Sequence, residues 1–484
     1  MARPDPWLEH YGASRGGPRR ARRLIAVALA ALAVIVAAAA VGLARRDHSW
    51  HPPKGVAFHP CTHGNRVAAR CAQLRVPVDA SRPEGRSISL HVAVIPATRQ
   101  PARGALFYLE GGPGGVATDA AVKVDEVFAN VSEYRDLVLV DQRGTGRSHA
   151  LVCPEEHVRA TDADAVAAYF RRCFARLGGE ARMLTSEAAA DDIERVRQVL
   201  GYQRIDIFGS SYGATLAQLY ASRHPGSVRT VTLDGGSLWS IPVYELAARN
   251  AERALRAGIA RCHTPRTACL RAFPRTEAEL EHLLATHPGS ADGIALTIAA
   301  LLRTPENAVR IPLIVHQAAT GLAEPLAREH AALVGAELDS RSRLAMVWTI
   351  LCGESWARAG VAATAGASGE SFLAHAAVAR AKLIREVCAA IPHPPGDADA
   401  LRPSGAPVLL LAGSADPLDP PANVSGWRAA FPNGRLVTVP GLAHGVVAYG
   451  CLRLLVARFV DDGSVGGLDT GCARHVALPR FELS

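Results

Sequence analysis

Short apolar runs that alternate with longer stretches of helical periodicity are the feature of this sequence that most limits its fold. Runs of this length that are apolar throughout indicate strands buried on both faces, as in a parallel sheet that helices cover on each side. Together they indicate an α/β chain with a mostly parallel central sheet. The runs at 105–109, 137–140 and 407–412 are apolar throughout, residues 87–96 alternate between apolar and polar, and further strand-like runs occupy 205–208, 228–233 and 435–439.

The stretch from residue 237 to residue 404 interrupts this rhythm. It is rich in Ala, Leu, Arg and Glu, its pattern is mostly helical, and strand-like runs resume only after it. We expect a helical cap over residues 237–404, inserted between a first core segment, 59–236, and a second, 405–484. The 484 residues are enough for one large domain with such an insertion.

An apolar run near the N-terminus predicts export. Residues 24–44 carry no charge, and a helix of that length would cross the hydrocarbon core of a bilayer. The preceding residues 1–23 are rich in Arg, Gly and Pro and are expected to be disordered, with their positive charge held in the cytoplasm. The run is either an uncleaved signal anchor or a long signal peptide cleaved near the small residues 42–44. Residues 45–58 then form a linker.

The net charge of +8 does not indicate a nucleic-acid partner. Residues 1–46 hold eight Arg and only two acidic residues, so +6 of the charge lies there and the rest of the chain carries about +2. A nucleic-acid-binding domain would be expected to concentrate positive charge on its folded part. Nucleic-acid binding is therefore excluded as the main function.

Ten cysteines follow the apolar run, and an even number in an exported chain indicates disulfides. Their spacing suggests that each pairs with the next along the chain, although spacing alone leaves the connectivity open. The sequence has no C-x-x-C and no Cys/His cluster with zinc spacing, so no metal is expected. The cysteines are Cys61, Cys71, Cys153, Cys173, Cys262, Cys269, Cys352, Cys388, Cys451 and Cys472.

The pentapeptide GSSYG at residues 209–213 fits the pattern G-x-S-x-G. A strand-like run, 205–208, precedes it and a helical stretch, 214–223, follows it. In this setting the serine sits on a sharp strand-to-helix turn, where side chains at the flanking glycine positions would clash. The pattern predicts Ser211 as a nucleophile and the backbone N–H of Tyr212 as one donor of an oxyanion hole.

A serine nucleophile needs a base, and the base needs an acid that orients it. In α/β-hydrolases the order along the chain is serine, acid, histidine. Asp416 follows a strand-like run and is the predicted acid; Asp419, ahead of two prolines, is its rival, and Asp234 is a third candidate. His444 lies in a glycine-flanked loop after the last run and is the predicted base.

The glycine-rich loop at residues 111–115 follows another strand-like run and is expected to supply the second oxyanion donor, with Gly112 favoured. Glycines let this backbone approach a substrate closely. A phosphate-binding P-loop is excluded because no Lys-Ser/Thr pair follows to open a helix. These motifs predict acyl transfer without a cofactor.

These residues resemble the proline iminopeptidase and tripeptidyl aminopeptidase family of α/β-hydrolases. The resemblance rests on EGGPGG at 110–115, DQRGTGRS at 141–148, the GSSYG motif and the segments around Asp416 and His444, and it covers roughly residues 55–475. The tail, with Cys451, DDG at 461–463 and Cys472, is similar to the secreted tripeptidyl aminopeptidase branch.

The resemblance implies an α/β-hydrolase fold with a helical cap, and a serine exopeptidase that removes residues from free peptide N-termini. Two departures bear on its substrate range. Proline iminopeptidases usually have His where this chain has Glu110, and the tripeptidyl branch usually has Thr-Pro where this chain has Asp419-Pro420.

An N-terminal exopeptidase must bind an ammonium group, and a buried cation needs an acidic partner. Glu354, in ILCGESW at 350–356, resembles an acidic position of the family's cap and is one candidate. Glu110, beside the glycine-rich loop, is the second. Glu354 is almost as readily explained as a solvated glutamate on a helix.

Two other functions fit the same residues. A carboxylesterase acting on small esters would use the same triad without needing a free amine, because fold and triad do not determine the leaving group. A non-catalytic binding protein on this scaffold would commonly lack a triad residue, and none is missing here. The oligomeric state and the preferred side chains are not indicated.

Overall fold

The computed structural model describes residues 50, 53, 55–154, 163–241, 243–339, 341–355, 371–393 and 401–484. The basic segment 1–23 and the apolar run 24–44 lie outside these residues. Among the described residues, no helix is both long and apolar enough to cross a bilayer. The folded unit runs from His51 to Ser484.

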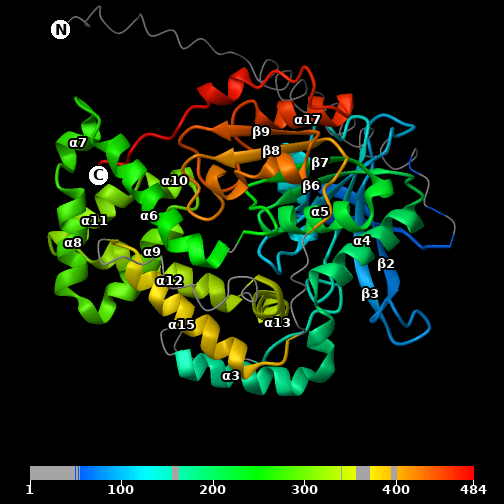
Figure 1. Cartoon of the computed structure of the whole chain (residues 1–484), viewed down its shortest axis with the longest axis horizontal. Coiled ribbons are helices and arrows are strands. Elements are labelled where there is room, and N and C mark those ends of the chain that lie inside the picture. The colour runs from blue at the N-terminus through cyan, green and yellow to red at the C-terminus, as the bar shows by residue number, and fades with distance from the viewer. Residues whose placement is uncertain are drawn as a thin grey trace, which may run out of the picture. The chain divides into compact units, whose positions relative to one another are not determined.

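A nine-stranded sheet forms the centre of the described core (Figure 1). Its strand order is β1-β2-β3-β5-β4-β6-β7-β8-β9, and every pair from β5 through β9 is parallel. The first three strands pair antiparallel, and β3 joins β5 antiparallel. The predicted mostly parallel sheet is therefore confirmed. The strands are β1 (His59–His63), β2 (Val67–Pro77), β3 (Ser87–Ile95), β4 (Ala105–Leu109), β5 (Asp136–Val140), β6 (Ile205–Ser210), β7 (Val228–Asp234), β8 (Val408–Gly413) and β9 (Gly434–Val439).

The parallel strands are apolar because helices cover both faces of the sheet. Every residue of β4, β5 and β8 is buried. Helices α2 (Ala121–Val127) and α17 (Leu452–Asp462) share one apolar cluster with the strands. Helix α5 (Tyr212–Arg223) packs on β6 and β7, and α4 (Ser186–Leu200) packs on α5.

Helix α4 shows how local sequence sets an element of the core. The Thr185 hydroxyl accepts the N–H of Ala188 at its start, and Gly201 ends it in the left-handed conformation with φ of 79°. A hydroxyl N-cap and a left-handed glycine are ordinary signals at the two helix ends. Residues next to each end of α4 thus determine where the helix begins and ends.

A helical cap lies between β7 and β8 and is drawn in green to yellow in Figure 1. Its apolar residues form a cluster of their own, separate from that of the sheet. A π-helical turn, Leu351–Ser355, follows α13. The described cap helices are α6 (Val243–Cys262), α7 (Ala268–Ala272), α8 (Thr276–Thr286), α9 (Ala291–Leu301), α10 (Pro305–Ala308), α11 (Ile311–Ala319), α12 (Glu324–Asp339), α13 (Arg341–Ile350) and α15 (Ala374–Ala390).

Helix α3 (Ala163–Leu177) belongs to the first core segment by sequence but packs along α15 of the cap (Figure 1). Its buried face includes Phe170, whose ring centroid lies 5.1 Å from that of Trp348 on α13. The cap is therefore built from more of the chain than the 237–404 segment predicted for it.

The C-terminal segment returns from the core to the cap. The Arg261 guanidinium of α6 lies 4.1 Å from the ring centroid of Phe481 and donates to the Pro479 carbonyl at 3.1 Å. Arg310 pairs with Glu482 at 3.4 Å. The last residues of the chain thus connect the sheet domain to the cap helices.

Five disulfides join the ten cysteines, and each joins neighbours in the sequence, as the spacing suggested. The enclosed separations run from 7 to 36 residues. The pairs are Cys61–Cys71, Cys153–Cys173, Cys262–Cys269, Cys352–Cys388 and Cys451–Cys472.

Candidate active site

Ser211 stands at the turn between β6 and α5, the position that the sequence predicts for the nucleophile. Its backbone has φ of 56° and ψ of −123°, a conformation that non-glycine residues rarely adopt. Its N–H donates to the carbonyl of Asp234 on the neighbouring strand at 2.9 Å, which holds the turn. Strain of this kind is typical of a serine presented at the top of an α/β-hydrolase sheet.

The glycines around Ser211 are required by close packing. A Cβ added at Gly209 would collide with the carbonyl of Gly213, and one at Gly213 would collide with the carbonyl of Leu109. A Cβ at Gly111 would lie 2.9 Å from the Cβ of Ser211. The clash expected from the G-x-S-x-G pattern is therefore present, and the glycine-rich loop lies directly against the serine.

Asp416 and His444 come together at the ends of β8 and β9. His444 Nδ1 lies 2.9 Å from Asp416 Oδ2, and because a carboxylate only accepts, the imidazole N–H is the donor. Asp416 is fully buried, and its other oxygen accepts the N–H groups of Leu418 and Asp419 at 2.8 and 2.9 Å. This arrangement orients the imidazole and leaves Nε2 for a second partner.

The two rival acids have other contacts. Asp419 Oδ2 is 3.9 Å from His444 Nδ1, and its other oxygen accepts the Ser237 hydroxyl. Asp234 is buried and accepts the N–H groups of Val446 and Val447 at 2.8 and 3.1 Å, so it anchors the loop that follows the histidine. Among the three, Asp416 alone lies within hydrogen-bond distance of the described imidazole.

The carboxylates around His444 determine its charge. Burial by itself would lower the pKa of His444, but the carboxylates of Asp416, Asp419 and Asp234 outweigh burial and raise it to about 9. Burial raises the pKa of Asp419 to about 6, although the nearby His444 opposes this. The imidazolium form is therefore favoured in the free protein near neutral pH.

A cavity of about 320 Å³ brings the predicted nucleophile and base together. Ser211, His444 and Gly112 all line it, so the ends of β6 and β9 meet the glycine-rich loop there. Much of the remaining wall is apolar and includes Phe128 and Phe208. The cavity can accept an apolar acyl group beside the serine hydroxyl.

Gly112 and Tyr212 occupy positions suited to an oxyanion hole. The N–H of Gly111 donates to Glu110 Oε1 at 2.8 Å, so the next amide along the loop, that of Gly112, is the better candidate. Gly112 has φ of 120°, which favours glycine. Tyr212 is the first residue of α5, and the positive end of a helix dipole favours a developing anion.

The two candidate ammonium-binding carboxylates lie in different places. Glu110 lines the cavity, and its Oε2 accepts the hydroxyl of Tyr108 at 3.0 Å. Glu354 is not among the described residues that line this cavity. It is only 7% exposed, and its two oxygens accept the N–H and the hydroxyl of Ser186 at 2.7 and 2.6 Å. Its interpretation as a solvated glutamate is therefore wrong.

Two residues outside the predicted site contact the phenol of Tyr212. Gln142 Nε2 donates to the phenol oxygen at 3.0 Å, and Ser186 Oγ lies 2.7 Å from it. Gln142 belongs to the DQRGTGRS motif that carries the family resemblance. In the same motif, Arg143 forms a two-pronged ion pair with Asp192 at 2.6 and 2.7 Å. The signal in the sequence that could have pointed to Gln142 was its place beside Arg143 in this motif.

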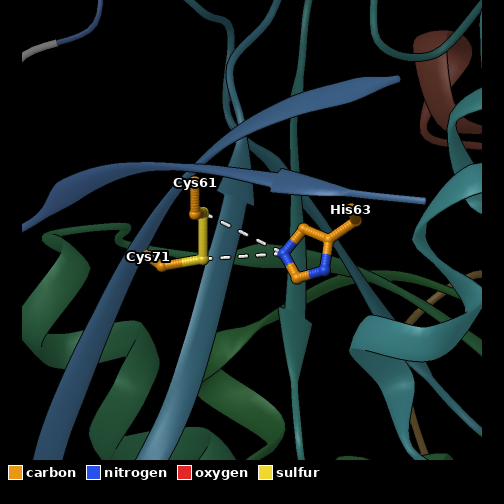
Figure 2. Close-up of side chains that lie close together, drawn as sticks. All are labelled: Cys61, His63 and Cys71. Atoms are coloured by element: carbon orange, nitrogen blue, oxygen red, sulfur yellow. Dashed lines mark hydrogen bonds between the residues drawn. A yellow bond between two sulfur atoms is a disulfide. The ribbon is translucent and has the colours of Figure 1, made fainter. Parts of the chain in front are cut away.

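Cys61, His63 and Cys71 are the one group of possible metal ligands found among the described residues, with their ligand atoms within 4.8 Å of one another. Figure 2 shows the imidazole turned toward the sulfurs, with Nε2 3.5 Å from Cys71 Sγ. The two sulfurs are joined in a disulfide, whereas a metal binds the thiolate. As paired here, the group cannot serve as a metal centre.

Comparison with known proteins identifies the family. The family model described as alpha/beta hydrolase fold matches residues 104–450. The chain belongs to the α/β-hydrolase family. The tripeptidyl aminopeptidase of Streptomyces lividans is 33% identical over 186 residues, which cover 34% of this chain and 35% of that protein.

Two further relatives of this α/β-hydrolase are also named as peptidases. Serine protease Hip1 of Mycobacterium tuberculosis is 30% identical over 242 residues, covering 44% of this chain and 46% of its own. Proline iminopeptidase of Neisseria gonorrhoeae is 34% identical over 130 residues, covering 27% and 32%. The matches span from about a third to less than half of these relatives. They confirm the resemblance inferred from the motifs.

Proposed function

We propose that the chain is a serine hydrolase that cleaves peptide bonds near free N-termini, with Ser211 as nucleophile, His444 as base and Asp416 as the orienting acid. The observation that carries the proposal is a cavity lined by both the strained Ser211 and the Asp416-bound His444. The peptidase names of the relatives support the choice of peptides as substrates.

The proposed reaction proceeds through an acyl-enzyme. Ser211 Oγ attacks the substrate carbonyl while His444 Nε2 takes its proton, and the negative oxygen that forms is held by the amides of Gly112 and Tyr212. His444 then protonates the leaving amine, and the C–N bond breaks. A water molecule activated by His444 releases the acyl group and restores the serine. Asp416 stabilises the imidazolium in both halves.

Recognition of the substrate ammonium is assigned to Glu110 in this proposal. Glu110 lines the cavity, and its carboxylate keeps further acceptor capacity after the bonds to Gly111 and Tyr108. A carboxylate beside the oxyanion loop would pair with an N-terminal ammonium close to the scissile bond. The other candidate, Glu354, is engaged with Ser186.

A carboxylesterase is the second candidate function. The observation in its favour is the apolar wall of the cavity, which includes Phe128, Phe208 and Val447 and would hold an ester acyl group without an amine. The same triad would perform the chemistry.

We also propose that the protein acts outside the cytoplasm, secreted or held at the membrane by residues 24–44. Five disulfides among the described residues are typical of an oxidising compartment. Cell fractionation with N-terminal sequencing of the mature chain separates the two forms. A reduced chain in the cytoplasm would contradict the proposal.

The decisive experiment measures turnover of three matched substrates by the purified chain and by Ser211→Ala. The substrates are a free-amine aminoacyl or tripeptidyl anilide, its N-acetylated counterpart and a short-chain ester. Cleavage of the free-amine anilide alone, lost in the variant, is the result expected of an aminopeptidase. Equal cleavage of the blocked anilide and the ester would replace it with an esterase. Turnover that persists in Ser211→Ala would refute the proposed nucleophile.

A further inference from the structure

The cap reaches the proposed oxyanion hole through a chain of buried hydrogen bonds. Glu354 lies in the π-helical turn after α13, and its carboxylate meets Ser186, the first residue of α4. Ser186 is fully buried and lies 2.7 Å from the phenol of Tyr212. Gln142, from the loop after β5, contacts the same phenol. These hydrogen bonds thus link four segments that are far apart in the sequence.

The chemistry of the groups gives this chain a direction. Ser186 has a single hydroxyl proton, and the carboxylate of Glu354 can only accept, so that proton is donated to Glu354. The phenol of Tyr212 must then donate to Ser186 Oγ. Gln142 Nε2 donates to the phenol oxygen. Every step runs toward Glu354, whose negative charge orders the donors in the chain.

Two donors at the start of α4 face the carboxylate of Glu354. Its Oε1 accepts the N–H of Ser186 at the start of α4, where the helix dipole is positive and the first amides lack partners within the helix. The Ser186 hydroxyl meets the second oxygen. A carboxylate from the cap region therefore accepts a backbone N–H at the N-terminus of α4, a helix of the core.

This row of hydrogen bonds ends at Tyr212, the residue after the proposed nucleophile. The side chain of Tyr212 is fixed at the start of α5, and its backbone amide is one of the two proposed oxyanion donors. A side chain held by Gln142 and Ser186 restricts rotation of that first helical residue. Donors that are held in place before reaction contribute most to transition-state stabilisation.

We propose that Glu354 is a positioning residue that, through Ser186, holds Tyr212 in the geometry that stabilises the oxyanion. The cap would then complete the catalytic site and not only shape its entrance. This inference rests on the proposed serine hydrolase chemistry, but it applies to peptide and ester substrates alike. It assigns Glu354 a role other than binding the substrate ammonium.

The test compares Glu354→Gln and Ser186→Ala with the wild-type chain on a free-amine anilide and on a short-chain ester. Each variant is expected to lower kcat by roughly 10- to 100-fold on every substrate that the wild type cleaves, a share of the loss seen when a donor is deleted outright. KM is expected to stay within about threefold, because ground-state binding does not use the oxyanion hole. Ser186→Thr, which keeps the hydroxyl, should restore most of the activity.

A boronic acid inhibitor that mimics the tetrahedral intermediate gives an independent measurement. Its inhibition constant should rise by the same factor by which kcat falls, while a product-like competitive inhibitor should bind as before. Glu306→Gln is the matched control, because Glu306 is a cap carboxylate that accepts a core hydroxyl, that of Tyr449, at 3.0 Å. We expect it to change kcat by less than about twofold.

Two results would overturn the inference. A rise in KM confined to free-amine substrates would make Glu354 the ammonium site, and unchanged kcat in both variants would remove any role in positioning. Should Glu354→Gln fail to fold, Ser186→Ala decides the matter. Failure of the proposed peptidase function is a separate outcome, seen as wild-type cleavage of the ester alone, and the ester still tests Glu354.

Discussion

The sheet domain and the cap contribute to the site in different ways. In the sheet domain, the proposed nucleophile, acid and base each follow the carboxyl end of a strand, β6, β8 and β9. In the cap, Glu354 lies in an irregular turn, and its carboxylate contacts Ser186, which in turn contacts Tyr212. The edge of a parallel sheet places reactive groups by topology. No such rule of topology places a residue of the cap, so its role has to be inferred from its contacts.

The largest effect is expected from the carboxylate that orients His444, and it tests whether Asp416 alone has this role. Asp416→Asn should lower kcat by roughly 10³- to 10⁴-fold, because an amide at this position favours the wrong tautomer of the imidazole. Asp419→Asn, whose oxygen is 3.9 Å from the same nitrogen, should cost less than about tenfold. Steady-state kinetics on the ester compares them. Equal losses would mean that the two aspartates act as a unit.

The loss of an ion pair should lower the free energy of unfolding far more in the sheet domain than in the cap. Arg143 and Asp192 form a buried ion pair in the sheet domain, with side chains 3% and 6% exposed. Arg143→Ala leaves Asp192 without this partner and is expected to lower the free energy of unfolding by about 3–5 kcal/mol. Arg328 and Glu324 of cap helix α12 are about two thirds exposed, and Arg328→Ala should cost no more than about 0.5 kcal/mol. Urea denaturation measures both, and similar losses would contradict the contrast.

The pH dependence of activity examines the sheet domain by itself. With the pKa of His444 raised to about 9, kcat/KM for the ester should rise with pH through neutrality and level off only in the alkaline range, since the base must be neutral to accept a proton. Asp419→Asn removes one of the carboxylates that raise this pKa, so the curve should move to lower pH. A wild-type plateau already reached at pH 7 would show that the imidazole is not held in its charged form.

The smallest effect is expected where the cap meets the histidine loop near the surface. Tyr449 donates its hydroxyl to Glu306 of the cap at 3.0 Å. Tyr449→Phe removes this bond between partly exposed groups and should change the free energy of unfolding by about 0.5–1 kcal/mol, with kcat within about threefold. Thermal denaturation and ester kinetics check it. A large loss of kcat would mean that the cap controls the histidine as well as Tyr212.

The fold of the sheet domain was predictable to the extent that its strands are buried on both faces. The runs at 105–109, 137–140 and 407–412, which became β4, β5 and β8, are apolar throughout, and the order of all the runs along the chain is that of an α/β sheet. The first two strands were not predicted as strands. His59–His63 has no apolar alternation, and Val67–Pro77 places Arg70 and Arg75 among its apolar residues because it lies toward the edge of the sheet.

The residues of the site also fall into a predicted and an unpredicted group. Ser211, Asp416 and His444 were predicted from local motifs, since each lies in a turn whose glycines or prolines are visible in the sequence. Ser186 and Gln142 were not given a role, because a serine at a helix start and a glutamine in a loop have many ordinary explanations. Their significance depends on which side chain they meet, and pairings over 26 and 70 residues of chain are not readable without a structure.

The order of the disulfides has a consequence for how the chain is made. A chain that crosses a membrane from its N-terminus presents each cysteine to the oxidising side in sequence order. Because every partner here is the next cysteine to emerge, each bond can close before a competing thiol arrives, after 7 to 36 further residues. With the export proposed above, we expect oxidation to yield the native pairs directly, with little need for thiol–disulfide exchange to correct them.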